Sequence, residues 1–270
     1  MSSDTDSTQS TTTTTTPPAT PTQFKSITQI QTFPLAHPPP PKHTLRLTSH
    51  LSLQIQQLTP TSRRPTPILE VYQPSCFGKT LAGGPRKLTA RDMYIVQSEE
   101  YTHLPGQSAG TIVGAIYMPV REETKKKGLS GGVWFPFGGG WEVSKVERGY
   151  RFSVRKLTTD GEGEVVRVVE WEKRSSRSRP SSAESGSEMK GDRFVLSIAD
   201  TTQSGLRRPW LATLTRKGFK VGGWNRAQRE YLSSALRGHG DVDEDAALYT
   251  CLLTMGVCVA AQEGWVNQYV

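Results

Sequence analysis

Cysteines are few in this chain of 270 residues, and its histidines are not spaced as metal-binding pairs. The three cysteines, Cys76, Cys251 and Cys258, include no CxxC pair, which argues against a disulfide framework or a cysteine zinc site. The five histidines form no pair at the i, i+4 spacing of a helix, so the sequence predicts no metal site and no cofactor. Sparse cysteine usage of this kind is typical of proteins kept in a reducing compartment.

An apolar leader is also missing from the start of the chain. Residues 1–22 contain no apolar stretch and carry acids rather than basic residues, unlike a secretory signal peptide. The first arginine is Arg46, whereas mitochondrial transit peptides are rich in arginine. We therefore expect a cytoplasmic protein that is not secreted, with a nuclear or peripheral membrane location as alternatives.

Apolar residues are few, and the deficit is greatest near the start. Hydrophobic residues make up 34% of the chain, and residues 1–44 contain a threonine run at Thr11–Thr16 and a proline run at Pro38–Pro41. Such a segment buries too little apolar surface to offset its ordering entropy. The sequence predicts a disordered tail over residues 1–44, whose proline run could bind a protein partner as a polyproline II helix.

Negative charge is in deficit too. Lysine and arginine total 33 against 25 acids, a net charge of +8, and the charges within residues 1–44 cancel. A basic surface favours anionic partners such as phospholipid headgroups, and a solvated surface without a dedicated partner is the alternative. The segment Gly131–Trp141 mixes aromatics with glycine but has no basic residue, so we expect a turning strand and no specific nucleic-acid site. The candidate contacts for an anionic surface are Lys125, Lys126, Lys127, Arg207, Arg208, Lys217 and Lys220.

From Leu45 onward, apolar and polar residues alternate along many short segments. This period of two is typical of strands with one buried face, and Gly, Pro, Asp or Ser clusters separate nearly all of them. No helical pattern lies between the strands, so the sequence favours an all-β sandwich or barrel over a βαβ sheet. The expected strands are Leu45–Leu47, Leu51–Ile55, Ile68–Tyr72, Asp92–Gln97, Thr111–Met118, Val133–Phe137, Trp141–Val146, Tyr150–Leu157, Val165–Trp171, Arg193–Ala199, Trp210–Thr215 and Phe219–Gly222.

One segment between two expected strands, Lys173–Lys190, has almost no apolar residue and is interpreted as a disordered insertion. Serines lie among its arginines, and Ser178 and Ser182 are the candidate phosphorylation sites. The segment carries a net charge of +3, and each phosphate adds about −1.5 to −2 at neutral pH, so two phosphates would cancel or reverse its charge. The insertion is therefore either a regulatory loop that contacts membranes or protein partners, or an inert surface loop.

The chain ends with two expected helices. Asn225 and Gln228 form a capping box for a helix over residues 225–237, and acids open a second helix over residues 243–262. The run 246–261 is uncharged and apolar on all sides, so it is either buried in protein or embedded in a membrane. It is shorter than the ~20 residues that span a bilayer, which favours burial inside a closed barrel over a tail anchor.

This order of elements resembles the tubby C-terminal-like superfamily, which includes tubby, LURP-one-related proteins and phospholipid scramblases. The resemblance covers about residues 45–265 and is carried by the many amphipathic strands and by the ending Leu248–Trp265. It implies a closed antiparallel barrel of about twelve strands around a central hydrophobic helix. The palmitoylated cysteine cluster of scramblases is absent, which argues against lipid scrambling, and no phosphoinositide contact of tubby has a matching position here.

A serine hydrolase is the alternative from another functional class. Residues 106–110 match G-x-S-x-G, with Ser108 as nucleophile, and Asp200 and His239 follow in the order of an α/β-hydrolase. That motif needs a strand before it and a helix after it, yet the residues that follow Gly110 are β-branched. We therefore expect one mainly β domain over residues 45–270. It is expected to act as a non-catalytic intracellular binding or scaffold module of unknown specific role, with anionic phospholipid surfaces as a candidate contact.

Overall fold

The computed structural model describes residues 30–39, 46–58, 64–98, 110–119, 131–137, 139–157, 163–174, 192–199, 210–236 and 244–266. In this part of the chain, twelve strands form a closed antiparallel barrel in which each strand pairs with the next and β1 pairs with β12. Two helices follow the strands. The elements are β1 (Gln31–Ala36), β2 (His50–Gln57), β3 (Thr66–Gln73), β4 (Met93–Gln97), β5 (Ile112–Tyr117), β6 (Gly132–Phe135), β7 (Gly139–Val146), β8 (Gly149–Leu157), β9 (Gly163–Arg174), β10 (Arg193–Ile198), β11 (Trp210–Thr215), β12 (Gly218–Val221), α1 (Arg226–Leu236) and α2 (Glu244–Gln262).

The alternation of the sequence places one side of each strand inside the barrel. Along β7, Trp141 and Val143 are buried, whereas Glu142 and Ser144 face outward. Successive side chains of a strand point to opposite faces, so an apolar–polar alternation closes around an apolar interior. The sequence prediction of a mainly β fold with a closed barrel is confirmed.

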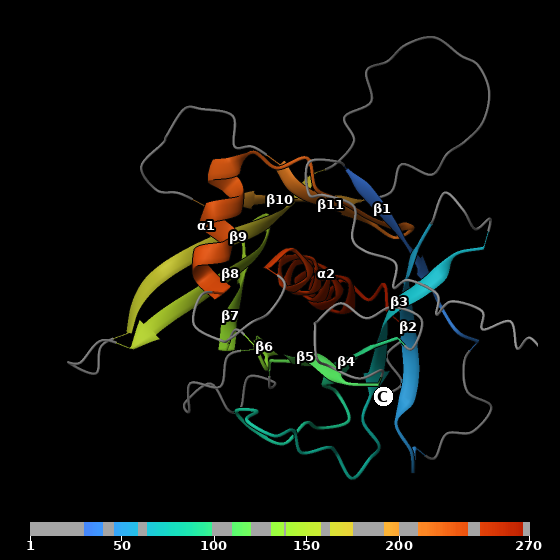
Figure 1. Cartoon of the computed structure of the whole chain (residues 1–270). Helices are drawn as coiled ribbons and strands as arrows, with labels where there is room; N and C mark the ends of the chain where they lie inside the picture. Colours follow the sequence, from blue (N-terminus) through green and yellow to red (C-terminus); the bar gives the residue numbers. More distant parts are fainter. Residues whose placement is uncertain are drawn as a thin grey trace, which may run out of the picture.

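Helix α2 runs through the middle of the ring of strands (Figure 1). All residues from 246 to 261 are buried, which confirms the predicted hydrophobic helix inside a barrel. Two glycines let the helix approach the wall closely. A Cβ at Gly256 would overlap the ring of Phe219 on β12, and a Cβ at Gly114 on β5 would lie 3.4 Å from Cγ2 of Thr254. Small residues on α2 therefore reflect the narrow space in which the helix lies.

Strand β1 corrects the prediction of an unstructured segment over residues 1–44. Its register places Phe33 opposite Phe219 on β12 and Leu35 opposite Ile55 on β2, so β1 closes the ring. Phe33 and Leu35 are the apolar residues of a short alternating segment that the surrounding Thr/Pro-rich composition obscured. Pro34 lacks the backbone N–H that other residues donate to a neighbouring strand. Proline is tolerated in strands at positions where no such hydrogen bond has to be donated. Residues 1–29 and 40–45 lie outside the described residues.

Helix α1 begins with the predicted capping box. The Asn225 side chain accepts a hydrogen bond from the Gln228 N–H at 2.8 Å, and the Gln228 side chain accepts one from the Asn225 N–H at 2.8 Å. These reciprocal bonds satisfy two donors that a helix start leaves unpaired. Tyr231 anchors α1 to β9, since its hydroxyl lies 3.2 Å from the N–H and 3.3 Å from the carbonyl of Val168.

The end of α2 is held by polar contacts with β8 and β9. The Tyr150 hydroxyl donates to Glu263 at 2.7 Å, and Lys173 bridges Glu263 at 3.2 Å and Asp192 at 2.9 Å. Burial, together with the bond to Glu263, raises the pKa of the Tyr150 phenol well above its usual value. The carboxylate of Glu263 therefore joins the buried helix to the strand that precedes the predicted insertion.

A segment outside the barrel, residues 74–92, covers β3 to β6 and forms a small second core. Asp92 organises it: its carboxylate accepts hydrogen bonds from both Arg86 terminal nitrogens at 2.6 and 2.9 Å and from the Thr89 N–H at 2.6 Å. The N–H of Met118, the residue that follows β5, donates a further bond of 2.8 Å to Asp92. Because the Asp92 side chain is only 1% exposed, these donors replace the water that its charge would otherwise bind. The apolar members of this second core are Leu81, Leu88, Tyr94, Ala115 and Tyr117.

Most predicted strands shift by one to three residues at their ends, and three sequence predictions need a larger correction. The strand predicted over 45–47 is wrong for its described residues, because Arg46 and Leu47 pair with no strand and Leu47 is exposed. Lys173 and Arg174 belong to β9, so the predicted start of the insertion at Lys173 is two residues too early; residues 175–191 lie outside the described part. The Gly131–Trp141 segment forms the β6–β7 hairpin, in which Phe137 lies in the turn rather than in a strand.

Candidate functional site

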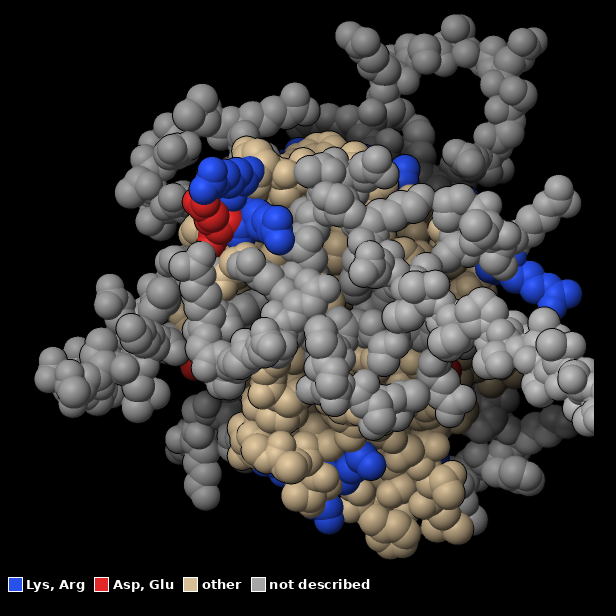
Figure 2. Space-filling model, in the orientation of Figure 1, with Lys and Arg blue, Asp and Glu red and all other residues tan. Residues whose placement is uncertain are grey.

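Two of the seven predicted contacts for an anionic surface, Lys217 and Lys220, lie within the described residues, and both are exposed. The lysines at 125–127, the arginines at 207 and 208 and the candidate phosphorylation sites Ser178 and Ser182 lie outside the described residues. On the face shown in Figure 2, the described basic side chains are scattered and one group lies beside acids. The described residues form no single broad basic patch on this face, so a candidate site depends on how a few basic side chains lie relative to their neighbours.

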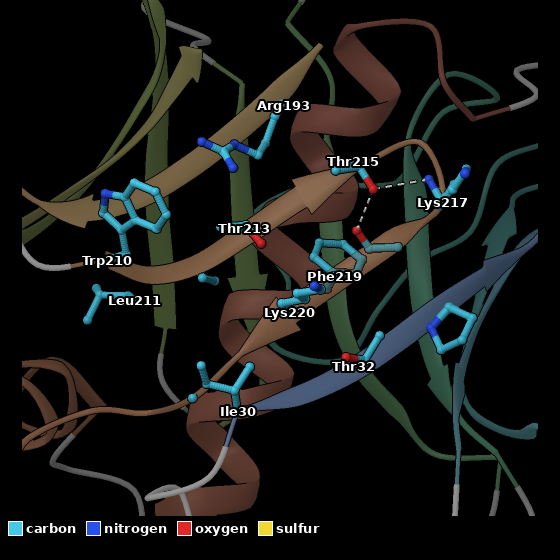
Figure 3. Close-up of a pocket in the computed structure, with 14 residues that line it drawn as sticks. Ile30, Thr32, Arg193, Trp210, Leu211, Thr213, Thr215, Lys217, Phe219 and Lys220 are labelled. Atoms are coloured by element: carbon cyan, nitrogen blue, oxygen red, sulfur yellow. Dashed lines mark hydrogen bonds between the residues drawn. The ribbon is translucent and has the colours of Figure 1, made fainter. Parts of the chain in front are cut away.

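Lys217 and Lys220 line one hollow on the outer face of β1, β11 and β12 (Figure 3). The hollow is open to solvent and has a volume of about 700 Å³, within the range of about 300–1,000 Å³ typical of small-ligand sites. It results from the sequence around β12, since Gly218 at the start of the strand and Gly222 just after its end stand two residues to either side of Lys220. Since residues two apart share a face of a strand, no side chain stands beside Lys220 along β12.

Hydroxyl groups flank Lys220 on the two neighbouring strands. The register pairs Lys220 with Thr32 of β1 on one side and with Thr213 of β11 on the other. Directly opposed residues of antiparallel strands have Cβ atoms about 4.5–5.5 Å apart, so the Lys220 side chain leaves the sheet between those of the two threonines. This row of two neutral donors and one charged donor is suited to an oxyanion.

Trp210 forms the other end of the hollow because the β10–β11 pairing is irregular. The register shifts between Leu196 and Ser197, which leaves Leu211 as an extra residue opposite β10. A bulge of this kind redirects the adjacent side chain. The Trp210 ring lies 5.1 Å from the Arg193 guanidinium carbon and 5.5 Å from that of Arg174, and it remains 38% exposed.

The positive charge of this face is largely uncompensated. Arg174 pairs with Glu172 at 3.0 Å, but among the described residues no acidic group forms an ion pair with Arg193, Lys217 or Lys220. Their three charges surround an apolar floor that includes Ile30, which is 69% exposed. In Figure 3, Arg193 lies near Trp210, Lys220 near the middle of the hollow, and Lys217 at the end away from Trp210.

A second hollow of about 310 Å³ lies on the outer face of β5, β6 and β7. Its walls are Trp134, Tyr117 and Arg86, and its floor is glycine backbone. Arg86 is neutralised by Asp92 and stacks at 4.7 Å on the Tyr117 ring, so this hollow has no comparable excess of positive charge. The hollow on β1, β11 and β12 is therefore the candidate site.

Sequence reasoning missed Arg193, Trp210 and the two threonines of this site. Trp210 and Arg193 begin strands, and nothing local indicates that β10 and β11 lie beside β12 with their side chains on the same surface. The glycines on either side of Lys220 were the one available signal, because glycine inside a strand often marks the close approach of a ligand or of another backbone.

The alternative sites receive no geometric support from the described residues. Gly110 lies in a turn that leads into β5, whereas a nucleophile elbow leads into a helix. Ser108, Asp200 and His239 themselves lie outside the described residues. Residues 246–261, considered as a tail anchor, are buried inside the barrel.

Within the described ranges, His, Cys, Asp and Glu side chains form no group of three that could hold a metal ion. The helices in those ranges include none that is both long enough and apolar enough to cross a membrane. Comparison of the chain with protein families, curated proteins and solved structures found no match.

Proposed function

We propose that this protein is a non-catalytic binding module that contacts anionic phospholipid surfaces through the outer face of β1, β11 and β12. The observation that carries the proposal is the combination of three uncompensated cations with exposed apolar side chains. Arg193, Lys217 and Lys220 attract phosphate, and Trp210 and Ile30 can enter the interfacial region. The architecture agrees with the resemblance to tubby-like proteins, and membership of that superfamily stays a prediction.

The expected affinity is modest and depends on salt. Each basic residue near an anionic leaflet contributes about 1 kcal/mol, so three cations contribute roughly 3 kcal/mol at physiological ionic strength. A tryptophan ring at the headgroup level adds to this, because its apolar body and polar N–H suit the interface. Screening within a Debye length of about 10 Å at 0.1 M salt weakens the electrostatic part as salt rises.

Liposome sedimentation at two salt concentrations tests the proposal. The protein should sediment with phosphatidylserine-containing vesicles at low salt, less at high salt, and hardly at all with phosphatidylcholine alone. A variant with Arg193→Gln, Lys217→Gln and Lys220→Gln should lose most of this binding.

The matched control is Arg91→Gln, Lys145→Gln and Arg148→Gln, which removes the same charge from exposed positions outside the hollow. If both triple variants bind equally, the attraction comes from net charge rather than from this face. If the wild-type protein does not bind anionic vesicles at low salt, the proposed function is wrong.

A further inference from the structure

We propose that the hollow holds one molecule of a single-chain anionic amphiphile, with its oxyanion at Lys220 and its chain on the apolar floor beside Trp210. This inference rests on the proposed function for the same face and deepens it. It replaces a diffuse contact between charges and a membrane with a defined site for one lipid-like molecule.

The headgroup end is defined by Thr32, Lys220 and Thr213, which stand side by side across three strands. A carboxylate or a phosphomonoester presents two or more oxygens, which can accept from the ammonium and from a neighbouring threonine hydroxyl. No acid among the described residues pairs with Lys220, so its ammonium is available to a ligand. A site built from two hydroxyls and an ammonium group favours an oxyanion over a neutral headgroup. A general basic surface discriminates less well between the two.

The chain end is defined by apolar groups that water still reaches. Ile30 is 69% exposed and Trp210 is 38% exposed, and both line the same hollow as Lys220 (Figure 3). A hydrocarbon chain that covers this surface removes apolar area from water, which favours binding. Gly222 lies at this side of Lys220 and leaves the backbone bare, so a chain can lie against the sheet.

The size of the hollow favours one molecule over a membrane area. The hollow is open to solvent, and its volume of about 700 Å³ is that of a small-ligand site, whereas contact with a membrane needs no hollow. Arg193, 5.1 Å from the Trp210 ring, and Lys217 at the opposite end extend the positive field along the whole length of the hollow. An amphiphilic anion is therefore attracted wherever it enters, and the row at Lys220 selects its headgroup.

The test uses monomeric ligands at concentrations at which they form neither micelles nor vesicles. Calorimetry with the full chain compares oleate, lysophosphatidic acid, inorganic phosphate and neutral monoolein. Both anionic amphiphiles, or one of them, should bind with a stoichiometry of one. Phosphate alone and monoolein should each bind at least about tenfold more weakly, because each offers one half of the contacts. The preferred anion identifies the headgroup as carboxylate or phosphomonoester.

Two variants test the geometry rather than the charge. Thr32→Val with Thr213→Val keeps the shape and β-branching of both side chains but removes the hydroxyls, and should weaken amphiphile binding by about tenfold or more. Thr80→Val, at an exposed position outside the hollow, is the control and should have no effect. Thermal unfolding of each variant checks that the barrel is intact.

The outcomes separate this inference from the proposed function. Binding to anionic vesicles without any binding of monomeric amphiphile overturns the single-molecule site and leaves the membrane contact in place. Binding of monomeric amphiphile without vesicle binding supports the site and refutes the membrane contact. Amphiphile binding that the double valine variant leaves unchanged refutes the headgroup row at Lys220.

Discussion

The substitution Gly256→Ala tests the packing of α2 against the barrel wall. Helix propensity alone favours alanine over glycine by about 1 kcal/mol in a helix interior. The barrel opposes it, because the added Cβ would lie 3.2 Å from Cδ1 of Phe219 and 2.9 Å from Cζ, and closer still to Cε1. Ordinary carbon–carbon contact requires about 3.5–4.0 Å, so the ring or the helix must move.

The Phe219 ring has little room in which to move. It is fully buried, and the Trp171 ring packs edge-on against it with centroids 6.5 Å apart. Overpacking a close-packed core costs typically 1–3 kcal/mol, and the overlap with three ring carbons places this case at the upper end. After the propensity gain is subtracted, we expect a net destabilisation of about 2 kcal/mol. For a domain of this size that corresponds to a fall in Tm of roughly 4–8 °C.

Two glycine controls and one rescue make the result specific. Gly140→Ala should change stability by no more than about 0.5 kcal/mol, because its Cβ would meet no atom within 4 Å. Gly114→Ala should be close to neutral, since its nearest contacts of 3.4 Å are ordinary. Adding Phe219→Leu to Gly256→Ala should recover part of the loss, with a coupling energy of about 0.5–3 kcal/mol in a double-mutant cycle.

Urea unfolding monitored by circular dichroism measures each of these changes. The reasoning is refuted if Gly256→Ala is as stable as the wild-type protein or more stable, because helix propensity would then act without opposition. It is also refuted if the two substitutions are additive, since additivity means that the residues at 256 and 219 do not share a contact.

Three further predictions concern the outer segment, the thiols and the pH dependence. Asp92→Asn should destabilise the protein by about 3–5 kcal/mol in urea unfolding, because it breaks a buried charge pair. If the variant is as stable as the wild-type protein, the 74–92 segment does not depend on this carboxylate. A thiol reagent should label Cys76 alone in the native protein and all three cysteines in denaturant. The reason is that Cys251 and Cys258 are buried, and burial raises the pKa of the Cys258 thiol to about 12. Rapid labelling of all three cysteines in the native protein would contradict the buried helix. The raised pKa of Tyr150 means that the folded state holds this proton more tightly than the unfolded state, so stability should be intact below pH ~10 and fall as pH rises beyond it. Replacing Tyr150 by Phe should reduce this alkaline loss in unfolding measurements, and an unchanged pH profile would show that the phenol is not linked to folding.

Local patterns predicted much of the fold. The alternation in β7 and its neighbours needs only the two-residue period of a strand, so burial could be inferred without knowledge of strand order. The capping box of Asn225 and Gln228 is complete within four consecutive residues and was found for that reason. The uncharged run 246–261 indicated burial because a helix without a polar face has no side that suits water.

Strand β1 was missed because its evidence is not local. Phe33 and Leu35 make a pattern too short to stand out beside a threonine run and a proline run, and Pro34 argues against a strand. Its place is determined by β12 and β2, which offer two free edges that one short strand can join. Closing the barrel removes both edges and buries Phe33, and this long-range gain outweighs the weak local propensity.

The sequence by itself determined the alternating strands, the buried helix and the excess of positive charge, since each depends on neighbouring residues or on composition. Only the tertiary structure decided which cations act together. Lys220 lies between Thr32 and Thr213 because β1, β12 and β11 are adjacent in the closed ring, and Trp210 joins them because a bulge turns it outward. Register and strand order depend on the closure of the whole barrel, and no short stretch of sequence contains that information.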